Sequence, residues 1–173
     1  MTVVHVMKMT GVAGAEKHLL LLTAGQRARG LDVHVIMLHE PGKPLRAFID
    51  AAAAADIPLH PLVIRADLDP TLPGRLRTLF RALRARIVHT HLLHADVHGI
   101  PAARLAGVPV VLTSRHNDNA FRRARHMRLM NRWLWRWADA GIAISDSIRR
   151  FAIEVEDAPP AKVRVIPYGI PLQ

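Results

Sequence analysis

The sequence predicts an α/β fold, a Rossmann-like doubly wound parallel sheet of about seven strands with helices on both faces. Short β-branched runs alternate with stretches of helical spacing along the whole chain of 173 residues. Half of the residues are hydrophobic and 22% are charged, which is typical of a globular domain. No internal repeat interrupts the alternation. Such alternation implies right-handed crossovers and a parallel sheet covered on both faces.

The first strand and helix are recognised by their ends. Thr2–Met7 is β-branched and apolar, which favours a strand. The glycine turn at 11–14 leads into a helix with an apolar centre at Leu19–Leu22. Arginines in its last turn and Gly30 just beyond it are typical of a helix end.

Proline and glycine separate the elements that follow. The strand Leu31–Leu38 ends before Pro41, and the alanine-rich helix Leu45–Ala55 ends before Pro58. The rest of this half is predicted as strand Leu59–Ile64, a proline-containing loop at 67–74 and the arginine-bearing helix Arg75–Ala85.

The second half begins with a short strand, Ile87–Thr90, whose β-branched residues indicate a buried central position. Gly107 ends the next helix, Ala95–Ala106, and a long helix follows at Arg122–Ala138. The remaining predicted elements are strands Pro109–Thr113, Ala140–Ile144 and Val163–Ile166, the loop Ser114–Ala120 and the helix Asp146–Val155.

Composition limits the classes of function. The formal charge of +10 favours anionic partners. Alternatively, it reflects a genome rich in alanine and arginine codons, with the arginines simply solvated. No nucleic-acid recognition module is present, so nucleic acid is not an expected partner. Without cysteine, a reducing, cytoplasmic setting is expected, and the amino-terminal apolar run is too short for a signal peptide. Peripheral contact with the inner face of a membrane is the alternative.

The predicted strand order 3-2-1-4-5-6 places a ligand site between strands 1 and 4. The loops after those strands, 11–16 and 91–94, are then neighbours. His89 and His91 share a strand face, and we expect His89 to pack in the core and His91 to contact substrate as the catalytic residue. No acid or cysteine lies at ligand spacing from them, so no metal and no other cofactor is expected.

Other polar residues are placed around this cleft as substrate-binding candidates. The turn offers backbone N–H groups and a helix amino terminus to a phosphate through Gly11, Ala13 and Gly14. Glu16 is expected to bind sugar hydroxyls or a basic neighbour, or else to favour the helix dipole. The remaining candidates are Arg115 and His116 after strand 5, His94, which can instead cap its helix, and Ser145, for which helix capping is a sufficient role.

The helical stretch 121–138 is rich in arginine and tryptophan. Its stripe of Met127, Met130, Leu134 and Trp137 is expected to face the core. The surrounding arginines, Trp133 and Trp135 would also suit an anionic lipid surface.

Five segments in order resemble the amino-terminal half of a family 4 glycosyltransferase, of the two-domain GT-B fold. They are Gly-Val-Ala-Gly-Ala-Glu (11–16), Ile-Val-His-Thr-His (87–91), Gly-Val-Pro-Val-Val-Leu-Thr-Ser-Arg-His-Asn (107–117), Ala-Ile-Ser-Asp-Ser (143–147) and Val-Arg-Val-Ile-Pro-Tyr-Gly-Ile (163–170). The resemblance implies a retaining transfer of sugar from a nucleotide-sugar donor to a lipid-linked or cell-envelope acceptor. It implies that the turn approaches the donor diphosphate, that His91 contacts the reacting sugar and that His116 lines the acceptor side.

Two departures from the family pattern stand out. Ala13 replaces the first of two paired glycines, and Tyr168 replaces the usual asparagine of the linker. The resemblance implies an acceptor-binding domain at 1–166, the start of an interdomain linker at 167–173 and a donor-binding domain that is absent, so the chain alone is expected to be inactive. The alternatives are a membrane-docking subunit without catalysis and half of a nucleotide-sugar epimerase.

Overall fold

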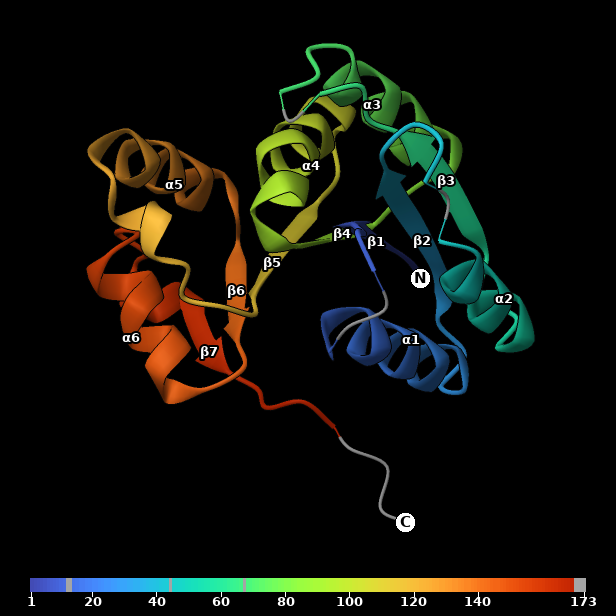
Figure 1. Ribbon diagram of the computed structural model, residues 1–173. Coiled ribbons are helices and arrows are strands. Elements are labelled where there is room, and N and C mark those ends of the chain that lie inside the picture. Colours follow the sequence, from blue (N-terminus) through green and yellow to red (C-terminus); the bar gives the residue numbers. More distant parts are fainter. Residues whose placement is uncertain (12–13, 44, 67, 170–173) are drawn as a thin grey trace.

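The computed structural model describes residues 1–11, 14–43, 45–66 and 68–169 (Figure 1). Seven parallel strands form one sheet in the order β3-β2-β1-β4-β5-β6-β7, so the predicted α/β fold and its strand order are confirmed. The strands are β1 (Thr2–Lys8), β2 (Asp32–His39), β3 (Leu59–Val63), β4 (Ile87–His91), β5 (Val110–Arg115), β6 (Ala140–Ala143) and β7 (Val163–Val165).

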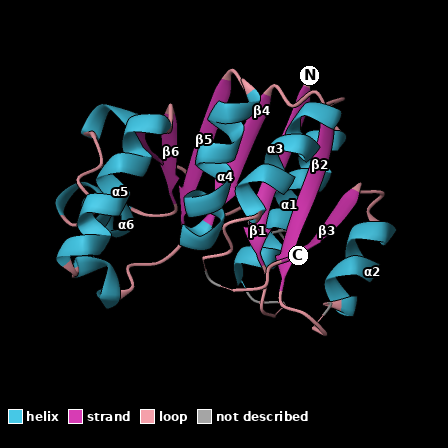
Figure 2. Cartoon of the chain, turned by 90° about the horizontal axis from the view of Figure 1, so that it is seen from above, coloured by secondary structure: helices cyan, strands magenta, loops and turns pink. Residues whose placement is uncertain are grey.

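Six α-helices cover the two faces of the sheet. In Figure 1, α1 lies on the lower side of the central strands, and α3 and α4 lie on the upper side; Figure 2 shows the same layers from above. The change of side occurs where the chain crosses from β3 back to β4, which is the reversal that defines a doubly wound sheet. The helices are α1 (Gly14–Arg27), α2 (Arg46–Ala54), α3 (Leu72–Ala82), α4 (Leu92–Ala106), α5 (Arg125–Trp137) and α6 (Asp146–Glu154), with short 3₁₀ turns at Ala120–Arg123 and Pro160–Lys162.

Each face has its own core. On the side of α1 and α2, Met7, Val35 and Met37 pack with Phe48 and Leu19. The other face holds the larger core, in which strand residues pack against α3, α4, α5 and α6; its members include Val4, Val6, Val88, Val111, Leu76, Phe80, Leu134, Trp135 and Ile148. The predicted stripe of the tryptophan-rich helix does face this core, because Leu134 is buried and Met127, Met130 and Trp137 pack against it. The prediction that Trp135 suits a lipid surface is wrong, since this side chain is buried in the same core.

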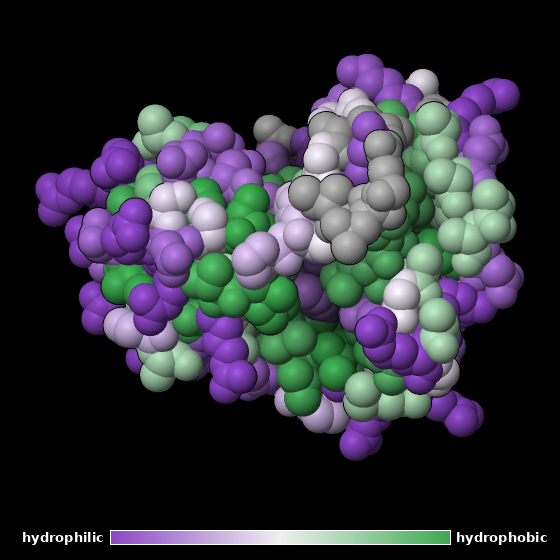
Figure 3. All heavy atoms as spheres, turned by 90° about the horizontal axis from the view of Figure 1, so that it is seen from below, coloured by the Kyte–Doolittle hydropathy of each residue, from purple (hydrophilic) through white to green (hydrophobic). Residues whose placement is uncertain are grey.

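The α1 side of the sheet is covered unevenly. Leu112 of β5 and Ile142 of β6 are only half-buried, and Ile166 is 51% exposed. Figure 3, which views the molecule from this side, shows apolar atoms gathered in the middle between hydrophilic rims. This part of the sheet therefore carries an apolar surface among the described residues.

Three helices begin three residues away from their predicted first residue. The loop at 67–74 is shorter than expected, because Pro73 and Gly74 lie in the first turn of α3, where a proline loses no helical hydrogen bond. The long helix is divided, since Ala124 is extended between the 3₁₀ turn and α5. Helix α4 begins at Leu92, directly after β4, rather than at Ala95.

Gly141 of β6 is expected to tolerate no side chain. A Cβ there would lie 2.2 Å from Cη2 of the buried Trp135 ring. We therefore expect Gly141→Ala to lower the free energy of unfolding by at least about 2 kcal/mol through overpacking. Urea unfolding measures this effect. In Gly74→Ala, where nothing lies within 4 Å of the added Cβ, alanine should leave stability equal or slightly higher; equal losses in both variants would contradict the packing argument.

Candidate functional site

The site lies at the switch point of the sheet, where β1 pairs with both β2 and β4. Side chains of neighbouring parallel strands line up by register: His5 lies opposite His89, and Met7 lies opposite His91. His91 in turn lies opposite Ser114 of β5. Since residues two apart share a strand face, these histidines form a layer on the α1 side of the sheet.

The histidines are hydrogen-bonded to one another. His5 Nδ1 lies 3.0 Å from His91 Nε2, and His91 Nδ1 lies 3.2 Å from His116 Nε2. His5 Nε2 contacts Gln26 Oε1 of α1 at 2.8 Å, and His116 Nδ1 contacts the Tyr168 hydroxyl. The structure thus brings together His91 and His116, two of the predicted site residues, with partners from three further segments.

His89 stands beside this series without belonging to it. Its Nε2 lies 2.7 Å from the Ser114 hydroxyl, and its ring centroid is 4.2 Å from that of His91. Only 4% of His89 is exposed. Its expected position as a hydrogen-bonded core histidine is confirmed.

Burial keeps these imidazoles neutral. Burial, reinforced by His18, lowers the pKa of His116 to about 4. Burial also lowers the pKa of His5 to about 4, although the bond to Gln26 opposes it. The pKa values of His89 and His91 fall well below the ordinary value for the same reason. At neutral pH each ring therefore carries one N–H and one bare nitrogen.

This burial predicts acid sensitivity. The folded-state pKa values of these four histidines lie below the ordinary 6.5, so the unfolded chain binds more protons as pH falls below that value. Their contribution to stability is complete above about pH 6.5 and is lost as pH falls toward 4. Urea titrations between about pH 7 and 5, where carboxylates remain ionised, should show a steadily falling free energy of unfolding. A constant free energy of unfolding over this range would contradict the role of the buried histidines. The control is His126→Gln, on the exposed side of α5, which should follow the wild-type curve.

A sharp turn follows β4. His91 is the extended residue before α4, and Leu92 has a positive φ of 66°. This conformation is unfavourable for a bulky side chain and is typical of functional sites. His94 lies in the first turn of α4, and the side chain of the N-cap residue His91 makes no capping hydrogen bond.

The glycine turn precedes α1 on the same edge of the sheet. Gly14 is the first residue of α1 and is exposed, and an added Cβ at Gly11 or Gly14 would meet no described atom within 4 Å. The open amino terminus of α1 is compatible with a phosphate. Ala13 lies outside the described residues. Glu16 is 6% exposed, and burial followed by the charge of Glu16 raises the pKa of Tyr168 to about 12, which places this carboxylate near the phenol.

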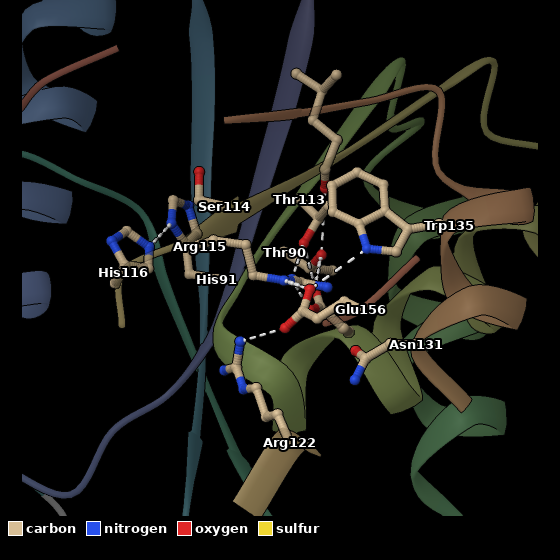
Figure 4. A network of polar contacts seen from close by, with 12 residues as sticks. Thr90, His91, Thr113, Ser114, Arg115, His116, Arg122, Asn131, Trp135 and Glu156 are labelled. Atoms are coloured by element: carbon tan, nitrogen blue, oxygen red, sulfur yellow. Dashed lines mark hydrogen bonds and ion pairs between the residues drawn. The ribbon is translucent and has the colours of Figure 1, made fainter. Parts of the chain in front are cut away.

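Arg115 does not line the cleft, so its predicted position there is corrected. Its guanidinium is 1% exposed and pairs with Asp96 and, through Nε at 2.6 Å, with Glu156. Glu156 also accepts from Arg122 Nη1 at 2.7 Å. Figure 4 shows Arg115 pointing toward Glu156, away from His91 and His116. The physical reason is strand parity: β5 continues through Arg115, so Thr113 and Arg115 face α4 while Ser114 faces the histidines.

Two charged neighbours hold this arginine as a cation. Burial alone would lower the pKa of Arg115. The negative charges of Asp96 and Glu156 outweigh this effect, so the pKa lies above its usual value. Burial would likewise raise the pKa of Glu156, and the two arginines lower it instead. The network is a structural element beneath the site.

Ser145 behaves as a helix cap. Its hydroxyl accepts from the backbone N–H of Ile148 at 3.3 Å, at the first turn of α6. This bond accounts for a serine at that position.

Three histidines have the geometry of a metal-ligand group. One ring nitrogen each of His5, His89 and His91 lies within 4.8 Å of the other two. These rings already bond to Gln26, Ser114 and one another, and no carboxylate completes the group among the described residues. The expectation that no metal takes part stays a prediction.

Sequence reasoning missed four members of the site: His5, His18, Gln26 and Tyr168. His18 stacks on Tyr168 with ring centroids 4.0 Å apart, and its Nδ1 is buried with no hydrogen-bond partner in the described part of the chain. Only the polar His5 inside an otherwise apolar strand gave a signal in the sequence. The other three depend on which helix face and which linker reach the switch point.

A model of Glycosyltransferase Family 4 matches residues 12–173. The chain belongs to glycosyltransferase family 4. A comparison with curated proteins finds no match. No helix in the described part of this family 4 chain combines the length and apolar content needed to cross a bilayer.

Solved structures show the same fold. Anabaena Alr3699/HepE, solved with UDP and glucose, aligns with a TM-score of 0.78 and 16% identity over 98% of this chain and 45% of its own. The lipopolysaccharide outer core galactosyltransferase WaaB aligns at 0.75 and 12%, over 100% and 47%. UDP-GlcNAc 2-epimerase from Neisseria meningitidis, bound to UDP-GlcNAc, aligns at 0.67 and 15%, over 95% and 46%. This chain therefore spans less than half of each of them, and the predicted resemblance to the amino-terminal half of GT-B enzymes is confirmed.

Proposed function

We propose that this domain is the acceptor-side half of a retaining glycosyltransferase, which moves a hexose from a nucleotide-sugar donor to a cell-envelope or lipid-linked acceptor. The observation that carries the proposal is the histidine layer at the switch point, which α1 approaches through His18, whose ring centroid lies 6.3 Å from that of His116. Family membership supports it. So do the structural neighbours, of which one was solved with UDP and glucose and another is a lipopolysaccharide galactosyltransferase.

In the proposed reaction the bond between the sugar C1 and the diphosphate oxygen breaks, and an acceptor hydroxyl bonds to C1 on the same face. The acceptor proton leaves with the diphosphate. Gly11, Ala13 and Gly14 would offer N–H groups to the diphosphate, and Glu16 would accept from sugar hydroxyls. His91, backed by His116, would hold hydroxyls of the reacting sugars, and His94 would lie at the rim.

A donor-consumption assay tests this proposal. The full-length enzyme is incubated with labelled UDP-sugars, with and without a lipid and cell-envelope extract. Release of nucleoside diphosphate that requires the extract is the expected result, and the 173-residue chain alone should give no turnover. Conversion of the donor without any acceptor would overturn the proposal in favour of an epimerase, like the structural neighbour from Neisseria meningitidis.

A second role is supported by the exposed face of α5. Leu129 and Trp133, one helical turn apart, are 67% and 43% exposed, and Phe121 just before the helix is 52% exposed. Exposed arginines surround them: Arg123, Arg125, Arg128, Arg132 and Arg136. Apolar anchors ringed by cations suit an anionic lipid surface, and such docking would bring the enzyme to a lipid-linked acceptor.

Vesicle flotation tests the lipid contact. The chain should float with phosphatidylglycerol vesicles at low salt and not with neutral vesicles. The double variant Leu129→Ser/Trp133→Ser should lose flotation, whereas Leu105→Ser on α4, at a residue 58% exposed, should not. Absence of wild-type flotation would remove the membrane role and leave the transferase proposal intact.

A further inference from the structure

Five side chains from five segments form one continuous hydrogen-bonded series. It runs from the amide of Gln26 on α1 through three imidazoles to the phenol of Tyr168 in the segment after β7. The first three hydrogen bonds are 2.8 Å from Gln26 Oε1 to His5 Nε2, 3.0 Å from His5 Nδ1 to His91 Nε2, and 3.2 Å from His91 Nδ1 to His116 Nε2. The last step joins His116 Nδ1 to the Tyr168 hydroxyl. We call this series the histidine relay.

The Gln26 end of the relay determines which atom donates in every hydrogen bond of the series. An amide oxygen can only accept, so His5 Nε2 carries the proton that it donates to Gln26. A neutral imidazole has one N–H, and His5 Nδ1 is therefore bare and accepts from His91 Nε2. The same reasoning leaves His91 Nδ1 bare to accept from His116 Nε2. His116 Nδ1, at the outer end, is then bare as well.

The outer end agrees with this direction. Burial, followed by the charge of Glu16, raises the pKa of Tyr168 to about 12, so the phenol keeps its proton and donates to His116 Nδ1. A second proton on His5 or His91 would set two N–H groups against each other, and one on His116 would require the phenol to turn and accept. All donors thus point from the linker toward α1.

We propose that Gln26 is a positioning residue that fixes the protonated nitrogen of His5, His91 and His116, so that the relay presents a bare nitrogen outward to a hydroxyl donor. The Tyr168 hydroxyl occupies that place here, and His116 is half-buried. A hydroxyl of a sugar ligand can replace the phenol, because it also donates. A phosphate or carboxylate oxygen only accepts, so the relay selects against an anion at this point. The ligand class rests on the proposed function; the direction of the relay does not.

Nitrogen-15 NMR on the histidine-labelled chain tests the direction, because the protonated and bare nitrogens of a ring have distinct shifts. We expect His5, His91 and His116 to be protonated at Nε2 at neutral pH. Gln26→Glu keeps an acceptor and should keep this pattern. Gln26→Lys supplies only donors and should move the proton to Nδ1 in all three rings. The control is Leu21→Gln, on the same helix at a residue 47% exposed.

The outcomes decide the proposal without an activity assay. Protonation at Nδ1 in the wild type, or an unchanged pattern in Gln26→Lys, overturns it. If Gln26→Lys does not fold, Gln26→Leu replaces it and should give mixed forms of His5; a single form there overturns the role of Gln26. In the full-length enzyme, Gln26→Lys should lower turnover about 10- to 100-fold and Gln26→Glu about threefold at most. The expected NMR pattern with unchanged turnover would refute the ligand assignment, and would leave both the relay and the proposed function intact. Absence of sugar transfer in the wild-type full-length enzyme would instead refute the proposed function.

Discussion

Sugar transfer by the full-length enzyme is expected to fall well over tenfold, on the order of 10²-fold, when His91 is replaced by alanine. The change removes the ring that is proposed to hold the reacting sugars. It also interrupts the contacts of His5 and His116, which lie 3.0 and 3.2 Å from its two nitrogens. Initial rates at saturating donor measure the effect.

His89→Ala is the matched control for this experiment. His89 lies on the same strand face and is also buried, but its bond goes to Ser114 and not to the relay. Both variants should lose comparable thermal stability, since each leaves a cavity of one imidazole. Only His91→Ala should show the large loss of turnover. Equal turnover in the His91 variant and the wild type would remove His91 from the mechanism.

Glu156→Gln is expected to lower the free energy of unfolding by about 3–5 kcal/mol, because it leaves two buried arginines with too little negative charge. Glu156 is fully buried and bonds to Arg115 at 2.6 Å and Arg122 at 2.7 Å. Its pKa is lowered in the folded state, so the stabilisation is present at neutral pH and is lost as pH falls through the folded-state pKa. Urea unfolding at neutral pH measures the loss.

The next residue provides the control. Asp157 pairs with Arg128 on the surface, with Nε to Oδ2 at 2.9 Å. Asparagine tolerates the positive φ of 56° at this position, so Asp157→Asn changes the charge and little else. It should cost less than about 1 kcal/mol. Similar losses in the two variants would show that burial does not govern the effect.

Much of the fold could be predicted because alternation of strand and helix leaves few arrangements of a parallel sheet. The pairing of β1 with β4, the two strands that carry His5 and His91, followed from strand order alone. Arg115 shows where the reasoning failed. The strand was expected to end at Thr113 and extends to Arg115, and each added residue changes the face on which a side chain lies. Its partners Asp96 and Glu156 are 19 and 41 residues away in the sequence, so no local sequence pattern indicated these ion pairs.

The relay was hidden for a related reason. His5 lies in a strand that is apolar on both faces, and a single polar residue there does not identify its partner. Gln26 lies near the end of an amphipathic helix, where a polar residue is ordinary. In the sequence, Tyr168 was noted only because it replaces the usual asparagine of the linker. In the structure its hydroxyl contacts His116 Nδ1 at the end of the series of imidazoles. These contacts depend on tertiary packing.

A crystal structure of the full-length enzyme with a UDP-sugar and a sugar acceptor fragment tests the central claim most directly. We predict that a hydroxyl oxygen of one of the two sugars lies within about 3.2 Å of a ring nitrogen of His116 or His91, in the place of the Tyr168 phenol. The donor diphosphate should face the amino terminus of α1. Sugars bound at another edge of the sheet, with the relay untouched, would contradict the account.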